Sequence, residues 1–212
     1  MKKKWIIIAS IIALILIGAA LTGPIMSDVE KPDYDVIASR DNIEIRRYAP
    51  MIIAEVTVEG KREDAIGDGF RLLADSIFGN NTTQKDIAMT APVQQQENQK
   101  IAMTAPVQQQ SSGNAWKVSF VMPSEYSMAS LPKPNNDRVH LKKVPPKKFA
   151  AIRFSGTNSD ENIAEHEAQL IEYIESNQIT ATGSPKYAFY NPPWTLPFMR
   201  RNEVMIEIDE QE

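Results

Sequence analysis

The segment PMIIAEVTVEG at residues 50–60 is matched 96 positions later by PKKFAAIRFSG at residues 146–156. In each segment a proline opens a run of alternating side chains and a glycine ends it, which is the pattern of a β-strand. An amphipathic helix is predicted directly after each segment, over residues 62–78 and from Ser159 to about residue 176. This order of elements is a weak signal once, but its recurrence at one spacing predicts two similar halves.

The rest of the chain supplies further runs that are typical of strands. They lie at residues 34–38, 43–48, 116–122, 138–144, 187–190 and 203–208. We therefore predict an α+β fold with pseudo-two-fold symmetry. Antiparallel strands, about eight in number, would form a sheet or open barrel with one helix from each half packed on it.

A ten-residue string, IAMTAPVQQQ, occurs twice, at residues 87–96 and 101–110. Alternation over its first five residues predicts a strand in each copy, ended by Pro92 or Pro106. The polar residues 94–100 could form the turn of a hairpin between the copies. The alternative is a local duplication without any chemistry, since no metal, phosphate or nucleophile motif contains this string.

Composition narrows the possible functions. The net charge is −4 and no basic stripe runs through the predicted domain, so nucleic acid is not expected as a partner. The chain has no cysteine, which excludes disulfides, thiolate metal sites, covalent c-type haem attachment and cysteine nucleophiles.

The N-terminal segment has the features of a membrane-directed sequence. Lys2, Lys3 and Lys4 precede an apolar run at residues 5–21, whose length lies between a signal-peptide core and a membrane span. We predict an uncleaved anchor or a signal peptide over residues 1–22, a linker over 23–32 and the folded domain over 33–212. A buried core helix is the third interpretation. With lysines on the cytoplasmic side, the domain would be exported: at the cytoplasmic membrane if anchored, periplasmic or secreted if cleaved.

Residues with catalytic chemistry form no recognisable motif. His140 alternates with apolar neighbours in a predicted strand, and His166 lies at the margin of a helix face, without the spacing of a metal pair. No nucleophile elbow or glycine-rich phosphate loop is present. Glu44 and Glu55 lie in predicted strands, where each is an exposed residue or a general base in a cleft. We predict no catalytic residues and no metal ligands.

The stretch YNPPWTLPFMRRNEV at residues 190–204 combines three prolines, large apolar residues and two arginines. Prolines stiffen it without backbone hydrogen bonds. It could cover the sheet as part of the core, or form one wall of an apolar groove with cations at its rim. A flat, apolar, dianionic ligand such as haem needs that second arrangement.

The chain resembles the SOUL haem-binding family. The resemblance covers about residues 34–208 and is carried by short strings that are specific in combination. These are IEIRRY at 43–48, MTAPV at 89–93 and 103–107, MPSEY at 122–126, LPKPNN at 131–136, RFSG at 153–156 and RRNEV at 200–204.

The resemblance implies a monomeric, pseudo-symmetric domain that binds haem or a related porphyrin non-covalently in an apolar groove. The axial ligand is unknown, and neither histidine matches a family ligand. The first helix, the duplicated strands and the C-terminal stretch are implied to supply the binding residues. The candidates are Phe70, Arg71, Ala74, Ile77, Met89, Met103, Trp194, Phe198, Arg200 and Arg201.

We predict that haem binding serves buffering or transfer at the cell envelope. Two alternatives of other classes remain: a small-molecule hydrolase or haem-degrading enzyme on the same fold, and an interaction domain with incidental haem affinity. A buried glutamate with a raised pKa would favour the enzyme. An apolar groove with basic residues at its rim would favour haem binding, and a closed core would favour the interaction domain.

Overall fold

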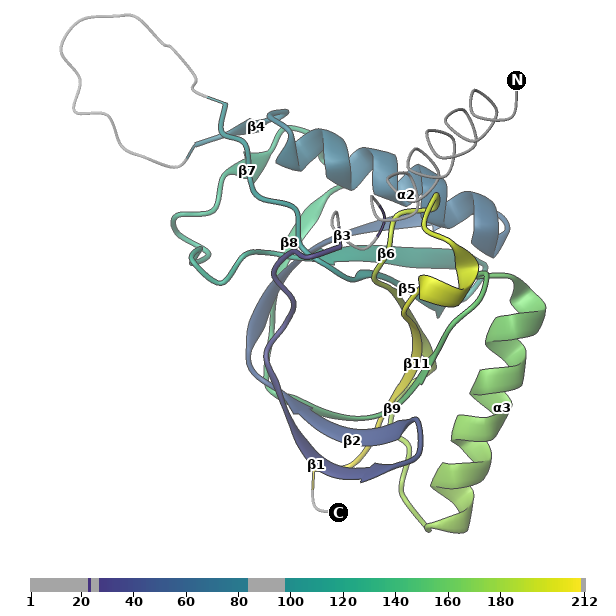
Figure 1. Cartoon of the computed structure of the whole chain (residues 1–212). Helices are drawn as coiled ribbons and strands as arrows, with labels where there is room; N and C mark the ends of the chain where they lie inside the picture. Colours follow the sequence, from purple (N-terminus) through teal and green to yellow (C-terminus); the bar gives the residue numbers. More distant parts are fainter. Residues whose placement is uncertain (1–22, 24–26, 84–97, 211–212) are drawn as a thin grey trace, which may run out of the picture.

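The structure, a computed structural model, describes residues 23, 27–83 and 98–210 of the chain. It contains two α-helices and a large sheet within these residues (Figure 1). In chain order the elements are β1 Tyr34–Arg40, β2 Ile43–Tyr48, β3 Met51–Glu59, α2 Arg62–Ile77, β4 Asn81–Thr82, β5 Val107–Ser112, β6 Ala115–Val121, β7 Lys133–Pro134, β8 His140–Val144, β9 Lys147–Phe154, α3 Asp160–Ser176, β10 Lys186–Phe189, the 3₁₀ helix η1 Pro197–Met199 and β11 Asn202–Glu207.

The nine-stranded antiparallel sheet has the order β1-β2-β9-β11-β10-β5-β6-β3-β8. The order is symmetric about the β10–β5 pair once the edge strand β1 is set aside. Each half gives one strand to the other, because β2 pairs with β9 and β8 pairs with β3. The predicted pseudo-two-fold α+β fold is thus confirmed, with nine strands rather than about eight and with a small extra sheet of β4 and β7.

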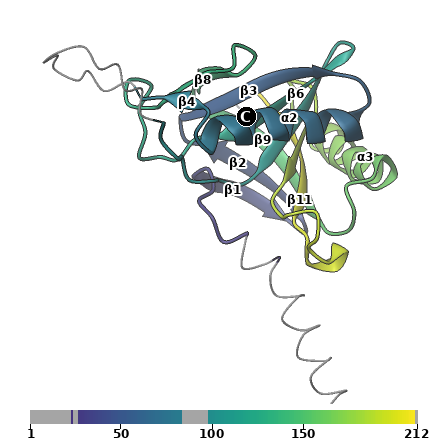
Figure 2. The ribbon, with the colours of Figure 1, turned by 90° about the horizontal axis from the view of Figure 1, so that it is seen from above.

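The sheet curls into an open barrel and both helices lie on its outer side (Figure 1). In Figure 2, seen from above, α2 crosses the β3–β6 part of the sheet and α3 lies beyond one end of α2. Helix α3 packs on β9 and β11. Two core clusters fill the spaces between helices and sheet, one under each helix. A third cluster lies on the sheet face away from the helices, and includes Tyr48, Phe149, Tyr190 and Met205.

The two helices form where the sequence predicts them, and their N-terminal ends are stabilised in different ways. The side chain of Ser159 accepts a hydrogen bond from the Asn162 amide and caps α3. No side chain caps α2, but Glu63 and Asp64 in its first turn favour the positive helix end. Gly69 lets α2 approach β6 closely: a Cβ there would lie 2.6 Å from the side chain of Val118.

The prediction for the duplicated string is wrong where the structure tests it. Residues 101–105 form no strand, and β5 begins after Pro106, at Val107. Ile101 and Ala105 are buried but donate their amides outside the sheet, to Ile77 O at 2.8 Å and Glu30 O at 2.9 Å. A proline is well tolerated just before a strand because its missing N–H is not needed there.

The predicted hairpin would pair the second copy with the first. The strand that contains the end of the second copy, β5, pairs instead with β6 and β10. The first copy, at residues 87–96, lies outside the described residues.

The predicted membrane segment at residues 1–22 lies outside the described residues as well. In the part of the chain that the structure describes, no helix has the length and apolar character needed to cross a membrane.

Candidate functional site

The loop at residues 190–201, between β10 and β11, exposes large apolar side chains. Trp194 is 57% exposed, Leu196 38% and Phe198 75%. Pro192, Pro193 and Pro197 restrict the backbone of the loop, and η1 begins at the last of them. Three such side chains within five residues make this loop an apolar surface of the kind that often marks a binding site.

The loop is braced by its own arginine and by the neighbouring strand. Arg200 donates from Nε to Thr195 O at 2.7 Å and from Nη2 to Pro193 O at 2.6 Å. The amide of Gly156 donates to Pro197 O at 2.9 Å. The exposed apolar side chains are therefore presented on a loop whose backbone is held in place.

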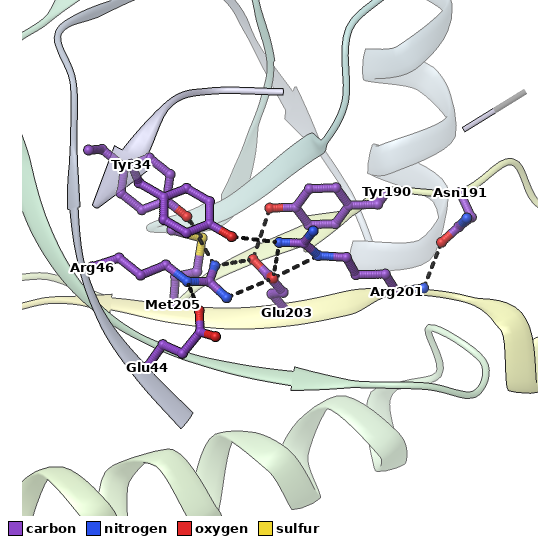
Figure 3. A network of polar contacts seen from close by, with 9 residues as sticks. Tyr34, Glu44, Arg46, Tyr190, Asn191, Arg201, Glu203 and Met205 are labelled. Atoms are coloured by element: carbon purple, nitrogen blue, oxygen red, sulfur yellow. Dashed lines mark hydrogen bonds and ion pairs between the residues drawn. The ribbon is translucent and has the colours of Figure 1, made fainter. Parts of the chain in front are cut away.

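A buried ionic network lies at the base of this loop, on the sheet face away from the helices (Figure 3). At its centre the carboxylate of Glu203, fully buried, accepts two bonds from Arg46, at 2.8 and 3.1 Å. Arg201 donates to the same carboxylate at 2.7 and 2.9 Å, and Tyr190 Oη at 2.9 Å. Arg46 also donates to Glu44 at 2.7 Å.

Aromatic rings surround the two arginines of the network. The guanidinium of Arg46 lies 4.5 Å from the ring centre of Tyr34, and that of Arg201 lies 4.0 Å from the ring centre of Tyr190. Tyr34 and Tyr48 are 5.0 Å apart between ring centres. These cation–π contacts add to the ionic bonds where the cations are removed from water.

The network also closes the loop. The amide of Arg201 donates to Asn191 Oδ1 at 2.6 Å, as Figure 3 shows, and the amide of Tyr190 donates to Arg201 O at 3.2 Å. Both ends of the loop are thus joined to each other and, through Glu203, to β2.

Electrostatics keep Glu203 ionised. Burial alone would raise its pKa, but hydrogen bonds and charge attraction from Arg46, and then from Arg201, outweigh this and hold the pKa of Glu203 below its usual value. Burial, followed by the Glu203 charge, raises the pKa of Tyr190, so its hydroxyl remains a donor. A carboxylate stabilised in this way is a poor proton acceptor, and Glu203 lacks the raised pKa that would favour an enzyme.

The four predicted site residues on α2 lie in different surroundings from the loop. Ala74 and Ile77 are buried against the sheet, and Phe70 makes an edge contact with Phe120 at 5.4 Å between ring centres. Arg71 has a side chain that is 76% exposed and pairs with Asp68 one turn away. The three apolar side chains of α2 are thus packed against the sheet and Arg71 extends into solvent, whereas Trp194 and Phe198 are apolar and exposed.

The remaining predicted residues are divided among other places. Met103 is 36% exposed, and Met89 lies outside the described residues. His140 is exposed on β8, while the His166 ring stacks on Phe154 at 4.1 Å. Within the described ranges, no group of three or more histidine, cysteine, aspartate or glutamate residues is arranged to hold a metal ion.

The family model described as SOUL heme-binding protein matches residues 29–207, which is most of the chain. The chain belongs to the SOUL family. No curated protein matches it.

Solved structures show the fold of this SOUL chain in distant proteins. The C-terminal domain of EcmrR has 10% sequence identity and a TM-score of 0.56, over 83% of this chain and 98% of that one. A hydrolase from Listeria innocua has 12% identity and a TM-score of 0.51, over 82% of this chain and 94% of that one. At such identities the likeness concerns the fold alone.

Of the ionic network of the SOUL chain, the sequence predicted Arg201 as a binding residue and named Glu44 and Tyr190 in other roles, but it did not predict the pairing of Arg46 with Glu203. Arg46 and Glu203 are 157 positions apart, and each lies inside one of the motif strings, IEIRRY and RRNEV. The available signal was a charged residue within each of two predicted strands, Arg46 in one and Glu203 in the other. Such a residue needs a buried partner, but only the β2–β9–β11 order identifies that partner.

Two hollows on the SOUL domain lie away from the exposed loop side chains. One, of about 300 Å³, lies where residues 30–33 pass the ends of β3 and β6. The other, of about 650 Å³, lies between the start of α2 and one face of α3, over Trp116 and Tyr187.

Proposed function

We propose that this SOUL domain binds haem or a related tetrapyrrole non-covalently on the apolar surface of the 190–201 loop. Membership of the SOUL family supports tetrapyrrole binding in general. The observation that carries the choice of site is the exposure of Trp194, Leu196 and Phe198 on one braced loop. Flat, apolar rings bind well to aromatic side chains that are already positioned.

The charges near the loop fit the two carboxylates of a haem. Arg201 donates hydrogen bonds to Glu203 and Tyr34, and the Glu203 carboxylate already balances its charge. Arg200 bonds only to neutral backbone carbonyls and forms no ion pair among the described residues. Arg200 is therefore the cation that we expect to pair with a propionate, while Arg201 holds the loop.

Neither histidine is placed to serve this surface as an axial ligand. The Nδ1 atom of His166 lies 2.7 Å from Asn162 O, on α3, and its ring stacks on Phe154. His140 belongs to the edge strand β8, which is four strands away from β10 in the sheet. The proposed binding therefore rests on apolar contact and charge pairing rather than on a histidine–iron bond.

Hemin titration of the full chain, followed by the Soret band, tests the proposal. The variant Trp194→Ala/Phe198→Ala should keep its stability, since both side chains are exposed, and should bind hemin at least tenfold more weakly, about 1.4 kcal/mol. Ile37→Ala on β1, where the side chain is 49% exposed, is the matched control and should bind as the wild type does.

Absence of any Soret change with the wild-type chain would refute tetrapyrrole binding. Normal binding by the double variant would refute the loop as the site and return attention to Phe70 and Arg71 on α2.

We further propose that binding serves buffering or transfer of the tetrapyrrole at the cell envelope. The support is the sequence of residues 2–21, three lysines followed by an apolar run. A reporter fused after Glu212 should be active outside the cytoplasm. Activity of the reporter only in the cytoplasm would contradict this location.

A further inference from the structure

The inner face of the curled sheet, which is the face away from the helices, carries a group of charged side chains. Lys186 on β10, Glu207 on β11 and Lys147 on β9 each stand two positions from a member of the third core cluster. Side chains two positions apart on a strand share a face, so all three lie on the side that faces the interior of the open barrel in Figure 1. Glu55 on β3 stands between two residues that pack under α2, so it lies on the inner face as well.

Two lysines of this inner-face group have a carboxylate partner. Lys147 donates to Glu207 at 2.6 Å. Lys142 on β8 donates to Glu55. Lys186 forms no ion pair among the described residues. Each carboxylate of the group is thus matched to another lysine, and Lys186 is the surplus cation.

The immediate surroundings of Lys186 are uncharged. Its side chain is only partly exposed, and its partners on the two adjacent strands are Gln110 and Met205. The Nζ atom lies 5.4 Å from the ring centre of Phe149, so an aromatic ring rather than a carboxylate lies beside the amine. The amine is therefore withdrawn from water without a bonded carboxylate to replace it.

The charges of the inner-face group favour the neutral form of this amine. Burial, and then the positive charge of Lys147, lower the pKa of Lys186. Glu207 and Glu55 act in the opposite direction but do not outweigh these two effects. The amine of Lys186 is thus neutral more often than that of an ordinary lysine.

The remaining titratable groups on the inner face of the nearby strands do not supply a carboxylate to Lys186. They are Lys117 on β6, His140 and Lys142 on β8, Arg153 on β9 and Glu203 on β11. The acid among them, Glu203, already accepts hydrogen bonds from Arg46 and Arg201.

We propose that Lys186 is a nucleophilic amine that condenses with small apolar aldehydes on the inner face of the barrel. A lysine that is desolvated and lies next to another cation is an activated nucleophile of this kind. The Phe149 ring beside Nζ favours an aldehyde with an apolar body. The inference is independent of tetrapyrrole binding, because Lys186 is at the end of β10 away from the 190–201 loop.

The reaction needs no group other than the amine and the aldehyde. The lone pair of Nζ attacks the carbonyl carbon and forms the C–N bond. Both amine protons transfer to the carbonyl oxygen, which leaves as water. The product is an imine with a C=N bond between the former carbonyl carbon and Nζ.

Reductive trapping with the full-length chain tests the proposal. Propanal and cyanoborohydride convert each imine into a stable propyl-lysine, which peptide mass spectrometry assigns to a residue. At pH 7, Lys186 should be alkylated at least about tenfold faster than the exposed Lys133, because an ordinary exposed lysine is almost wholly protonated at this pH. Equal or slower alkylation of Lys186 would overturn the proposal.

The pH dependence distinguishes a more nucleophilic amine from one that is only easier to reach. The ratio of Lys186 alkylation to Lys133 alkylation should fall as the pH rises from 7 to 10, since ordinary lysines then gain free amine and Lys186 has less to gain. A ratio that is constant with pH would show a difference in access alone and would contradict the proposal.

Two substitutions should change the alkylation rate of Lys186 in opposite directions, with Lys133 as the reference in each variant. Lys147→Met removes the neighbouring cation and releases Glu207, so it should slow the reaction by about threefold or more. Glu55→Gln removes a carboxylate that favours the ammonium form, so it should speed the reaction by a similar factor. Circular dichroism checks that both variants are folded. A change in the same direction in both, or no change in either, would refute the role assigned to Lys186.

Discussion

Replacing Glu203 by glutamine should destabilise this SOUL domain strongly. The substitution keeps the size of the side chain and removes the charge at the centre of the network. Glu203 accepts five hydrogen bonds, from Arg46, Arg201 and Tyr190. Glutamine would leave two guanidinium groups facing a neutral amide on the inner face of the sheet, and its NH₂ group would compete with them as a donor.

The burial of Arg46 and Arg201 determines how much unfolding free energy the Glu203→Gln substitution removes. The Arg46 side chain is 2% exposed and the Arg201 side chain 20%, so water cannot hydrate the Arg46 charge in the folded state and hydrates the Arg201 charge only in part. Breaking a buried ion pair by removing one partner costs about 3 to 5 kcal/mol. We expect a value near 3 kcal/mol, because Arg46 keeps its bond to Glu44 at 2.7 Å.

The effect should depend on pH in a defined direction. The pKa of Glu203 is lowered in the folded state, so its contribution is complete above the unfolded pKa of about 4.3 and is lost as the pH falls through the folded pKa. The wild-type chain should therefore lose stability below pH 4. The stability difference between wild type and Glu203→Gln should shrink over the same range.

Urea unfolding of the full-length wild type and variant, followed by circular dichroism at pH 7 and in steps below pH 5, measures both effects. Glu207→Gln is the matched control: the same change on the same strand, at an ion pair with Lys147 whose side chains are 31% and 33% exposed. This control should cost no more than about 1 kcal/mol. A loss at Glu203 as small as that at Glu207, or a difference that is constant with pH, would refute the reasoning.

Two further predictions concern helix packing and iron ligation. Gly69→Ala should destabilise the domain by about 1 to 3 kcal/mol in urea unfolding, because its Cβ would lie 2.6 Å from Val118. Gly67→Ala meets nothing within 4 Å and should instead stabilise α2 by about 0.5 to 1 kcal/mol, so stabilisation by both changes would show that α2 does not pack as described. Replacing His140 and His166 together by alanine should change hemin affinity less than tenfold in the Soret titration. A larger loss with an altered Soret spectrum would identify an axial histidine.

The elements of this fold could be predicted from the sequence because they depend on local patterns. Alternation over residues 51–59, the glycines that follow the two matched strands and the cap at Ser159 are all visible in the printed chain. The equal spacing of the two halves then predicted the pseudo-two-fold arrangement, since each half has the same faces to bury.

The order of the strands was beyond sequence analysis. The exchange of β2 and β8 between the halves joins segments about 100 residues apart, and no local signal specifies which antiparallel neighbour a strand takes. The duplicated string shows the same limit. Its alternation predicted strands before the prolines, but contacts with Ile77 and Glu30 hold the second copy there instead.

For the candidate site, the sequence alone determined which residues are chemically suited to a tetrapyrrole: the aromatic residues and the two arginines of the 190–204 stretch. Only the tertiary structure decided how they are used. Trp194 and Phe198 are exposed, whereas Ala74 and Ile77 on α2 are buried. Arg201 is neutralised by Glu203 while Arg200 lacks a carboxylate partner among the described residues. Burial and ion pairing depend on which strands are neighbours, and that is a property of the whole fold rather than of any segment.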